Sequence, residues 1–217
     1  MGEARLGTQV RREQIAEAAL AVISEQGLAG LSVAAVARRV GLVPSAIYRH
    51  FDGKEGVIDA VVGLIRERLL RNVREACTEV DDALDCLRRI LTRHVQLIRN
   101  NVGVPRVVFS EELYASRPGR KGEVHAVVTG YLASVAEVIR RGQAAGRIRP
   151  ELDAGTLSVL FLGLVQPSAI LWHLSDGQFD VTKHTQRAWE VFRGAIEAPG
   201  LPRPTQRRES GREGEML

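Results

Sequence analysis

The chain has 217 residues, of which 45% are hydrophobic and 26% are charged, and its formal net charge is +4. These values are typical of a soluble globular protein, and the length allows a small domain joined to a larger one. The mild positive charge permits a nucleic-acid partner without requiring one. The patterns GxxxxGK, GxSxG and HExxH are absent, as is any His/Cys cluster at metal-ligand spacing. We therefore expect neither an enzyme nor a bound cofactor or metal ion.

The two cysteines, Cys77 and Cys86, lie in helical and partly apolar stretches. This setting favours small core residues over a disulfide or a zinc site. The first residues, MGEARLGTQVRREQ, contain no apolar segment of the kind found in signal peptides. The longest apolar run, residues 157–174, is interrupted by a glycine, a glutamine and a proline, so we expect it to be too short and too polar for a membrane span. The expected compartment is the cytoplasm, with no membrane partner.

Nearly every segment shows the helical period, which predicts an all-α fold of about nine helices. In the first third, Thr8 is the expected N-cap of a helix that ends at Gly27, and Ser32 is the expected N-cap of a second helix that Gly41 terminates. A short third helix is expected to begin at Pro44. Asp52 and Glu55 form a capping-box-like start to a long fourth helix that reaches about residue 77.

The remainder predicts helices over about 82–100, 105–116, 123–145, 153–174 and 181–197. Residues 117–122 read as a polar loop, Asp153 as an N-cap, and Pro167 as a kink in the most apolar helix. Residues 199–217 have almost nothing to bury, so a disordered tail is expected there.

The spacing of Ala37, Gly41 and Ile47 is that of a helix-turn-helix. A small residue lets the two helices approach, glycine can adopt the positive φ of the turn, and Ile47 can pack back into the core. The residues that follow, IYRHF at 47–51 and GKE at 53–55, closely resemble the recognition helix and fourth-helix start of tetracycline-repressor-like (TetR-family) regulators. The resemblance covers residues 10–60 at the level of motifs, and further along only the architecture matches.

The resemblance implies a helix-turn-helix DNA-binding domain over residues 1–54 and a helical effector-binding and dimerisation domain over residues 55–198. It also implies that the third helix enters the major groove of an operator. Arg49 is the exposed residue able to make a bidentate contact to guanine, a contact that discriminates by roughly 1–3 kcal/mol. The full set of implied DNA-binding residues is Ser32, Val43, Pro44, Ser45, Tyr48, Arg49, His50 and Lys54.

The apolar helix around residues 157–174 is hydrophobic almost all round, so it should be buried on every side, by the core on one side and by a partner subunit on the other. The resemblance implies a homodimer held by this helix and the last one. The expected interface residues are Leu157, Leu160, Phe161, Leu164, Leu171, Trp172, Trp189 and Phe192. The alternative is that both helices belong to the core of a monomer.

The resemblance further implies a cavity for a small hydrophobic or amphipathic effector among the helices between residues 57 and 145. Each candidate can equally be an ordinary core residue. The candidate lining residues are Ile65, Leu69, Ile90, His94, Phe109, Leu113, Tyr131 and Val135.

The expected function is therefore that of a ligand-responsive repressor that binds a palindromic operator as a dimer. The alternative is a helical adaptor that binds proteins and has a non-functional helix-turn-helix, in which Tyr48, Arg49, His50 and Lys54 would be dispensable. The expected mechanism is a tilt of the long fourth helix that changes the separation of the two recognition helices.

Overall fold

The computed structural model describes residues 2–101, 103–175 and 178–199, and the predicted tail falls almost wholly outside them. Within these ranges the chain forms helices and one isolated bridge, Ile148 to Glu197. The helices are α1 (Gly2–Gln26), α2 (Val33–Val40), α3 (Pro44–Tyr48), α4 (Gly53–Thr78), α5 (Ala83–Asn100), α6 (Gly103–Val108), α7 (Glu111–Ser116), α8 (Arg120–Ala144), α9 (Ala154–Gly163), α10 (Gln166–Leu174) and α11 (Val181–Ile196). The predicted all-α fold is confirmed, and eleven helices appear in place of about nine because two expected helices are each divided.

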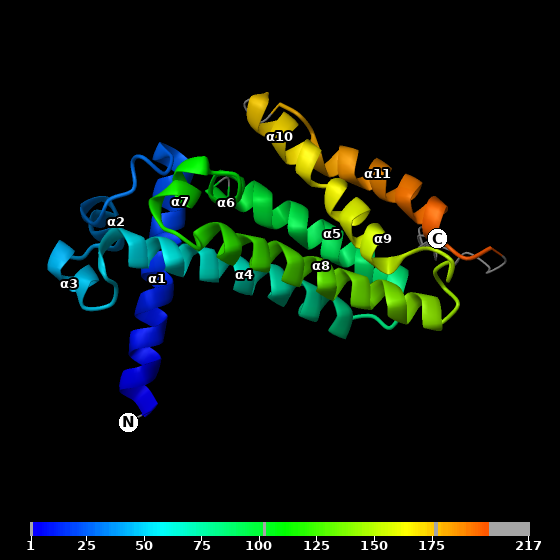
Figure 1. Cartoon of the computed structure of the whole chain (residues 1–217), viewed down its shortest axis with the longest axis horizontal. Coiled ribbons are helices and arrows are strands. Elements are labelled where there is room, and N and C mark those ends of the chain that lie inside the picture. The colour runs from blue at the N-terminus through cyan, green and yellow to red at the C-terminus, as the bar shows by residue number, and fades with distance from the viewer. Residues whose placement is uncertain (1, 102, 176–177, 200–217) are drawn as a thin grey trace, which may run out of the picture.

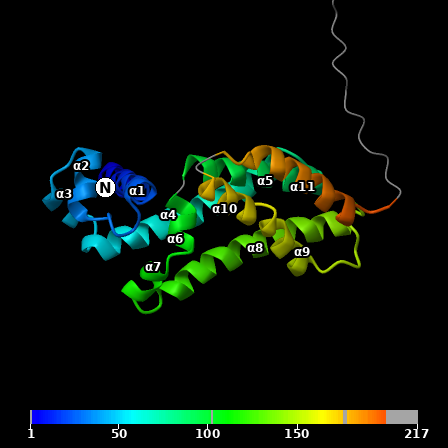
Figure 2. The same cartoon turned by 90° about the horizontal axis from the view of Figure 1, so that it is seen from above.

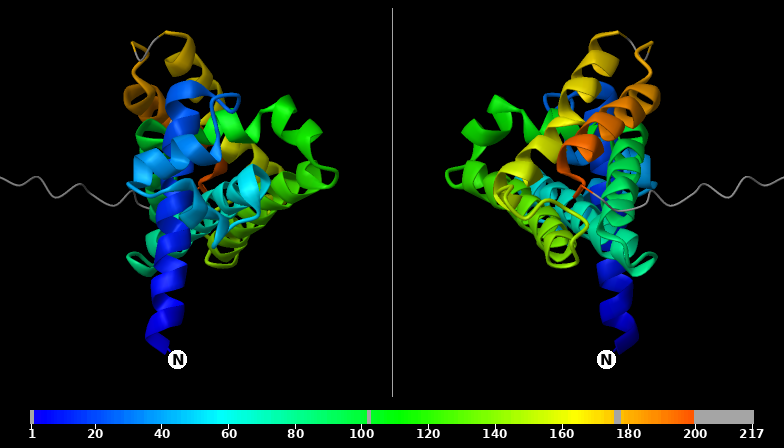
Figure 3. Two further views of the ribbon diagram at one scale, coloured as in Figure 1. Left: turned by 90° about the vertical axis from the view of Figure 1, so that its left-hand side faces the viewer. Right: turned by 90° about the vertical axis from the view of Figure 1, so that its right-hand side faces the viewer.

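Helices α1 to α3 form a small unit at one end of the molecule, and α4 runs from this unit along the larger domain (Figures 1 and 2). Helices α4, α5 and α8 contact one another and make the centre of that domain. Helix α9 packs on α8, α11 packs on α5, and α10 contacts both α9 and α11. Seen from the end, the N-terminal turns of α1 project away from the other helices (Figure 3). Helix α4 is thus the element shared by both parts.

Local capping rules set several of the boundaries. The Ser32 hydroxyl accepts a hydrogen bond from the Ala35 amide at 3.1 Å, and Asp82 accepts from Leu84 at 2.9 Å. Asp153 accepts from the Thr156 amide at 2.7 Å. Each bond satisfies an amide of a first helical turn that has no partner within its helix. The predicted starts of α2, α5 and α9 are confirmed.

Some predicted boundaries are wrong, and one predicted cap is not formed. Residues 120–122, expected in a loop, belong to α8, which begins at Arg120. Helix α1 begins at Gly2, so Thr8 lies inside it and does not cap it. Helix α4 begins directly after Asp52 as expected, but the Asp52 side chain makes no capping bond, and Glu55, the other half of the predicted capping box, bonds to Arg120. The segment 105–116 is two helices, since the Ser110 hydroxyl accepts from the Leu113 amide at 3.1 Å and starts a new helix there.

Pro167 divides the apolar segment rather than kinking it. Helix α9 ends at Gly163, and α10 begins at Gln166 with Pro167 in its first turn, where its missing N–H is not needed. By length and composition, Ala154–Trp172 does meet the requirement for a membrane span, with 19 residues and a mean hydropathy of 1.7, contrary to the expectation. One such stretch is weak evidence, because apolar helices of soluble proteins meet the same requirement.

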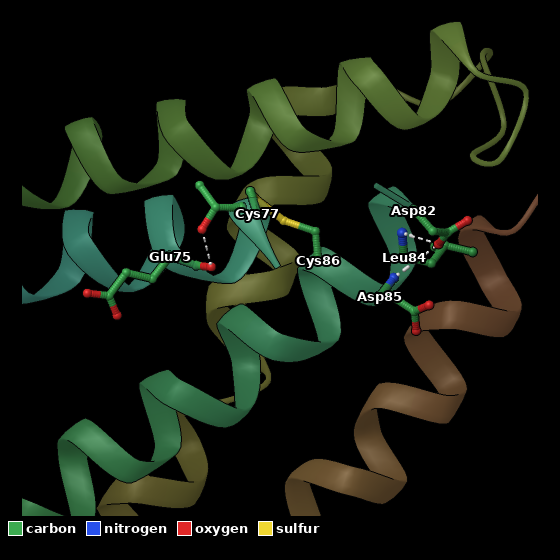
Figure 4. The surroundings of a disulfide bond; sticks show 7 residues. Glu75, Cys77, Asp82, Leu84, Asp85 and Cys86 are labelled. Atoms are coloured by element: carbon green, nitrogen blue, oxygen red, sulfur yellow. Dashed lines mark hydrogen bonds between the residues drawn. A yellow bond between two sulfur atoms is a disulfide. The ribbon is translucent and has the colours of Figure 1, made fainter. Parts of the chain in front are cut away.

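Cys77 and Cys86 form a disulfide, which overturns the expectation of two free core cysteines (Figure 4). The bond joins the last turn of α4 to the first turn of α5 across a short connection. The sequence pattern favoured free thiols because both residues lie in helices. The close approach of the two helix ends, which sets the Cα atoms 5.1 Å apart, depends on the tertiary packing.

Candidate functional site

The core of the N-terminal unit is continuous with that of the larger domain. Val36 and Ala37 of α2, Ile47 of α3, and Ile15 and Ile23 of α1 are all buried in it. Gly41 adopts a φ of 74°, which L-residues with a side chain rarely adopt, and it turns the chain sharply between α2 and α3. The predicted roles of Ala37, Gly41 and Ile47 are thus met, and α3 is fixed in one orientation.

The outer face of α3 carries most of the predicted DNA-binding residues. Val43 is 63% exposed and Tyr48 is 61% exposed, while Pro44, Ser45 and Arg49 are exposed beside them. Arg49 makes no ion pair with any residue that the structure describes. This surface is poor in polar groups, and the guanidinium of Arg49 is its strongest hydrogen-bond donor.

The end of α3 is held by α1. Arg12 donates to the carbonyl of His50, and its guanidinium lies 4.3 Å from the centroid of the Phe51 ring, a cation–π contact. His50 itself is half-buried, and Lys54 donates to the carbonyl of Leu28 at 3.4 Å. Two of the side chains predicted to contact phosphates, His50 and Lys54, are therefore partly buried. Sequence reasoning missed Arg12, because nothing in the spacing places it beside α3.

The larger domain contains a mostly apolar cavity between α5, α6, α8 and α10. Its volume is about 60 Å³, and an adjoining cavity of about 200 Å³ shares five of its lining residues. Phe109 is 57% exposed and Ile170 is 52% exposed, so both lie at the rim. The first cavity is lined by Leu69, His94, Ile98, Val104, Pro105, Val108, Phe109, Val128, Tyr131, Leu162, Gln166, Ala169 and Ile170.

Two polar side chains meet inside this cavity. The His94 Nδ1 and the Tyr131 hydroxyl are 2.9 Å apart, and the two rings pack edge to face with centroids 5.2 Å apart. Burial lowers the pKa of His94 to about 4 and raises the pKa of Tyr131. Both side chains are therefore neutral at pH 7.

Comparison with known proteins identifies the family. Residues 15–61 match the model described as "Bacterial regulatory proteins, tetR family", and residues 66–195 match that of the "YsiA-like protein, C-terminal region". The chain is a TetR-family transcriptional regulator. The family predicted from residues 47–55 is confirmed, as is the helix-turn-helix followed by a helical domain.

Several relatives of this regulator share most of its length. The fatty acid metabolism regulator protein of Bacillus subtilis is 23% identical over 84% of this chain and 94% of its own. The nucleoid occlusion factor SlmA of Vibrio cholerae is 23% identical over 86% of this chain and 96% of its own. The structure of FadR from Bacillus subtilis in complex with stearoyl-CoA has a TM-score of 0.70, 22% identity, and coverage of 84% of this chain and 98% of its own. That likeness shows the same fold.

The predicted effector residues of this regulator fall into two groups. Leu69, His94, Phe109 and Tyr131 line the cavity. The other four, Ile65, Ile90, Leu113 and Val135, are buried in the core and do not line it. Sequence reasoning missed the contributions of α6 and α10, because the period of a helix does not tell which of its apolar residues border a void.

The predicted dimer residues also divide. Leu160 and Leu171 are about half exposed, and Leu164 and Trp172 are partly buried. The other four are buried within the single chain, and their place in an interface stays a prediction: Leu157, Phe161, Trp189 and Phe192. Large exposed apolar side chains nevertheless gather on these helices. We call this surface the apolar face of α9–α11; it contains Val159, Leu160, Ile170, Leu171, Leu174 and Val191.

Helix α6 links the cavity to the DNA-binding unit (Figure 1). Its Val104 and Pro105 line the cavity, while Arg106 donates to the carbonyl of Ser24 at 2.9 Å near the end of α1. The amide of Gly103 donates to the Ser24 hydroxyl at 2.8 Å. A Cβ on Gly103 would lie 2.6 Å from that hydroxyl oxygen, so only glycine allows this approach.

A buried arginine makes a second link, between α4 and α8. The Arg120 side chain is 0% exposed and donates to Glu55 and Asp59 of α4, each at 2.6 Å. Burial alone would lower the pKa of Arg120, but its hydrogen bonds to Asp59 and Glu55 and their charges outweigh burial and raise it. Glu55 lies in the first turn of α4. The first turns of α4 are thereby fixed to the start of α8.

Proposed function

We propose that this regulator binds a palindromic operator as a homodimer, represses transcription in the bacterial cytoplasm, and is released by a small hydrophobic or amphipathic effector. The observation that carries the proposal is the position of α6. One side of this short helix borders the cavity, and its other side contacts α1 through Arg106 and Gly103. A change at the cavity can therefore reach the DNA-binding unit through one rigid element.

On the DNA side, α3 enters the major groove and Arg49 reads guanine. Ser32, Tyr48, His50 and Lys54 contact phosphates, and Val43, Pro44 and Ser45 lie against base edges. Because this set contains few polar readers, thymine methyl contacts and DNA shape contribute to operator preference.

The apolar face of α9–α11 is the proposed dimer interface. Six large apolar side chains on this face are between 46% and 77% exposed in the single chain. Large apolar side chains exposed together on neighbouring helices are typical of an interaction surface. A helix-turn-helix protein also needs two copies to contact two half-sites.

The effector acts by enlarging the cavity. Ligand cavities of proteins usually measure roughly 300–1,000 Å³, whereas this one measures about 60 Å³ with about 200 Å³ adjoining it. A bound molecule therefore favours a conformation in which α6 and α10 lie further apart. Helix α6 moves α1 with it, and the separation of the two recognition helices changes. A coupling of about 1–3 kcal/mol, or 5–150-fold in operator affinity, is usual for such linked sites.

The relatives narrow the effector class. One relative is a fatty acid metabolism regulator, and the FadR structure contains stearoyl-CoA. The apolar lining of the present cavity suits a hydrocarbon chain. We therefore propose acyl compounds as the first effectors to test.

Operator selection from random DNA, followed by gel shifts, tests the proposal. Selection should return an inverted repeat, and Arg49→Ala should relax the preference at one base position in each half-site. Arg141→Ala is the matched control, because Arg141 is exposed near the far end of α8. Adding stearoyl-CoA or methyl nonanoate should lower operator affinity at least fivefold. If selection returns no sequence and Arg49→Ala binds DNA no differently from the wild type, the protein-binding adaptor is favoured instead.

A further inference from the structure

The walls of the cavity are mostly apolar, but the cavity also contains side chains that can form hydrogen bonds. His94 is 6% exposed and Tyr131 is 2% exposed, and they bond to each other. Gln166 is the other polar side chain on the described lining, and it is half-buried. A buried polar group without a hydrogen-bond partner is energetically costly, so each donor and acceptor of this pair requires a partner.

At neutral pH the His94–Tyr131 pair holds two polar hydrogens, one on the imidazole and one on the hydroxyl, because both side chains are neutral. Their mutual hydrogen bond uses one of them. If Tyr131 donates to Nδ1, the imidazole hydrogen is on Nε2. If Nδ1 donates to Tyr131, the hydroxyl hydrogen is free. Either arrangement leaves one donor without an acceptor among the residues that the structure describes.

The charged side chains near the cavity limit which chemical group of an effector can accept that hydrogen bond. No lysine or arginine occurs among the described residues that line it. Arg106 lines the adjoining cavity, but its guanidinium bonds to the carbonyls of Ile23 and Ser24. An ionised carboxylate beside His94 would therefore be buried either without a counter-charge or against a protonated imidazole whose pKa burial lowers to about 4, and both states are unfavourable. An uncharged oxygen acceptor carries no such penalty.

We propose that the effector places a neutral carbonyl oxygen, as in an ester, thioester, lactone or ketone, against the His94–Tyr131 pair. Its hydrocarbon part lies along the apolar lining of α5, α6 and α10 and extends past Phe109 at the rim of the cavity. This inference rests on the proposed effector cavity and names the chemical class of molecule that the cavity accepts.

Three probes of similar size test the inference by calorimetry or tryptophan fluorescence on the full-length protein. Methyl nonanoate carries a neutral carbonyl, decanoate has the same number of heavy atoms but is ionised at pH 7.5, and 1-chlorodecane has no oxygen. We expect methyl nonanoate to bind about tenfold more tightly than decanoate. Equal binding of the ester and the carboxylate would overturn the inference.

Variants of the pair test the role of the unused donor. Tyr131→Phe leaves the imidazole hydrogen, and His94→Leu leaves the hydroxyl hydrogen, so each single variant should lose only a few-fold in affinity for methyl nonanoate. The double variant lacks both donors of the pair and should lose tenfold or more, while its affinity for 1-chlorodecane is unchanged. The matched control is Tyr114→Phe, since Tyr114 donates to the carbonyl of Val108 and does not line the cavity. If the double variant loses affinity for methyl nonanoate and for 1-chlorodecane to the same extent, the pair has only a structural role and the inference is overturned.

Operator gel shifts with the same probes separate this inference from the proposed function. If all three probes bind equally and all weaken operator binding, the effector cavity stands and the carbonyl inference fails. If the ester binds preferentially without changing operator affinity, the carbonyl inference stands and the release mechanism fails. If no probe binds, both fail.

Discussion

Replacing Arg120 with glutamine tests whether the link between α4 and α8 stabilises the fold. The arginine donates to Glu55 and Asp59 at 2.6 Å each and also to the Ser116 hydroxyl at 2.6 Å. Arg120→Gln keeps a polar side chain of smaller size but removes the charge and the two-pronged donor geometry. Both carboxylates on α4 then lose their buried partner.

The expected cost follows from the exposure of the partners. A hydrogen bond to a charged group contributes roughly 1.5–3 kcal/mol, and an exposed ion pair contributes roughly 0–1 kcal/mol. The Arg120 side chain is 0% exposed, while the Glu55 and Asp59 side chains are 45% and 34% exposed. The pair of contacts lies between these limits, so we expect a loss of about 2 kcal/mol in the free energy of unfolding. For a chain of this length, the melting temperature should fall by about 4–8 °C.

Thermal and urea unfolding of the wild type, Arg120→Gln and Arg117→Gln measure this loss. Arg117 is the matched control, because it also contacts Asp59, at 2.8 Å, but its side chain is 37% exposed. Its replacement should cost about 0.5 kcal/mol. Equal losses in the two variants, or a loss below about 0.5 kcal/mol for Arg120→Gln, would refute the assignment of a stabilising role to burial of the guanidinium.

Further expectations concern the joint between α1 and α6, the cavity histidine and the disulfide. Gly103→Ala should cost about 1–3 kcal/mol of unfolding free energy and weaken operator binding, because the new Cβ would lie 2.8 Å from the Leu20 carbonyl oxygen. Gly130→Ala, with nothing within 4 Å, is the matched control, and equal melting temperatures for the two variants would contradict the close approach. His94 has a folded-state pKa of about 4 against an ordinary 6.5, so below pH 6.5 the unfolded chain takes up a proton that the folded chain does not. Stability should therefore fall by about 3 kcal/mol between pH 6.5 and pH 4 in the wild type, and His94→Leu should lack this component in urea unfolding at each pH. Reducing the disulfide, whose cysteines are 9 positions apart, should lower the free energy of unfolding by about 3 kcal/mol, and a Cys77→Ser variant should not respond to dithiothreitol in the same melting assay.

The N-terminal unit was largely predictable because its structure follows from neighbouring residues. Ser32 caps α2 and Gly41 takes a positive φ, and both roles depend on a few positions of the chain. The orientation of α3 follows from the burial of Ile47. The same local rule located Asp153 as a helix start. The capping box at Asp52 did not form, and its Glu55 bonds instead to Arg120, which is distant in the sequence.

The dimer surface shows a limit of helical periodicity. A helix that is apolar on every side does not reveal which side faces its own chain. The sequence could assign both Leu160 and Phe161 to an interface, but the structure buries Phe161 against Phe192 and leaves Leu160 about half exposed. Only the packing of α9 against the other helices of its own chain separates the two.

What the sequence by itself determined is the class of protein: an all-α, helix-turn-helix regulator whose exposed α3 carries Arg49. These features depend on contacts between residues close in the chain. The tertiary structure alone decided the position of the cavity, the pairing of His94 with Tyr131, and the burial of Arg120 against α4. The partners of these two pairings lie 37 and 61 positions apart, so their contacts follow from how the helices pack and not from any local pattern.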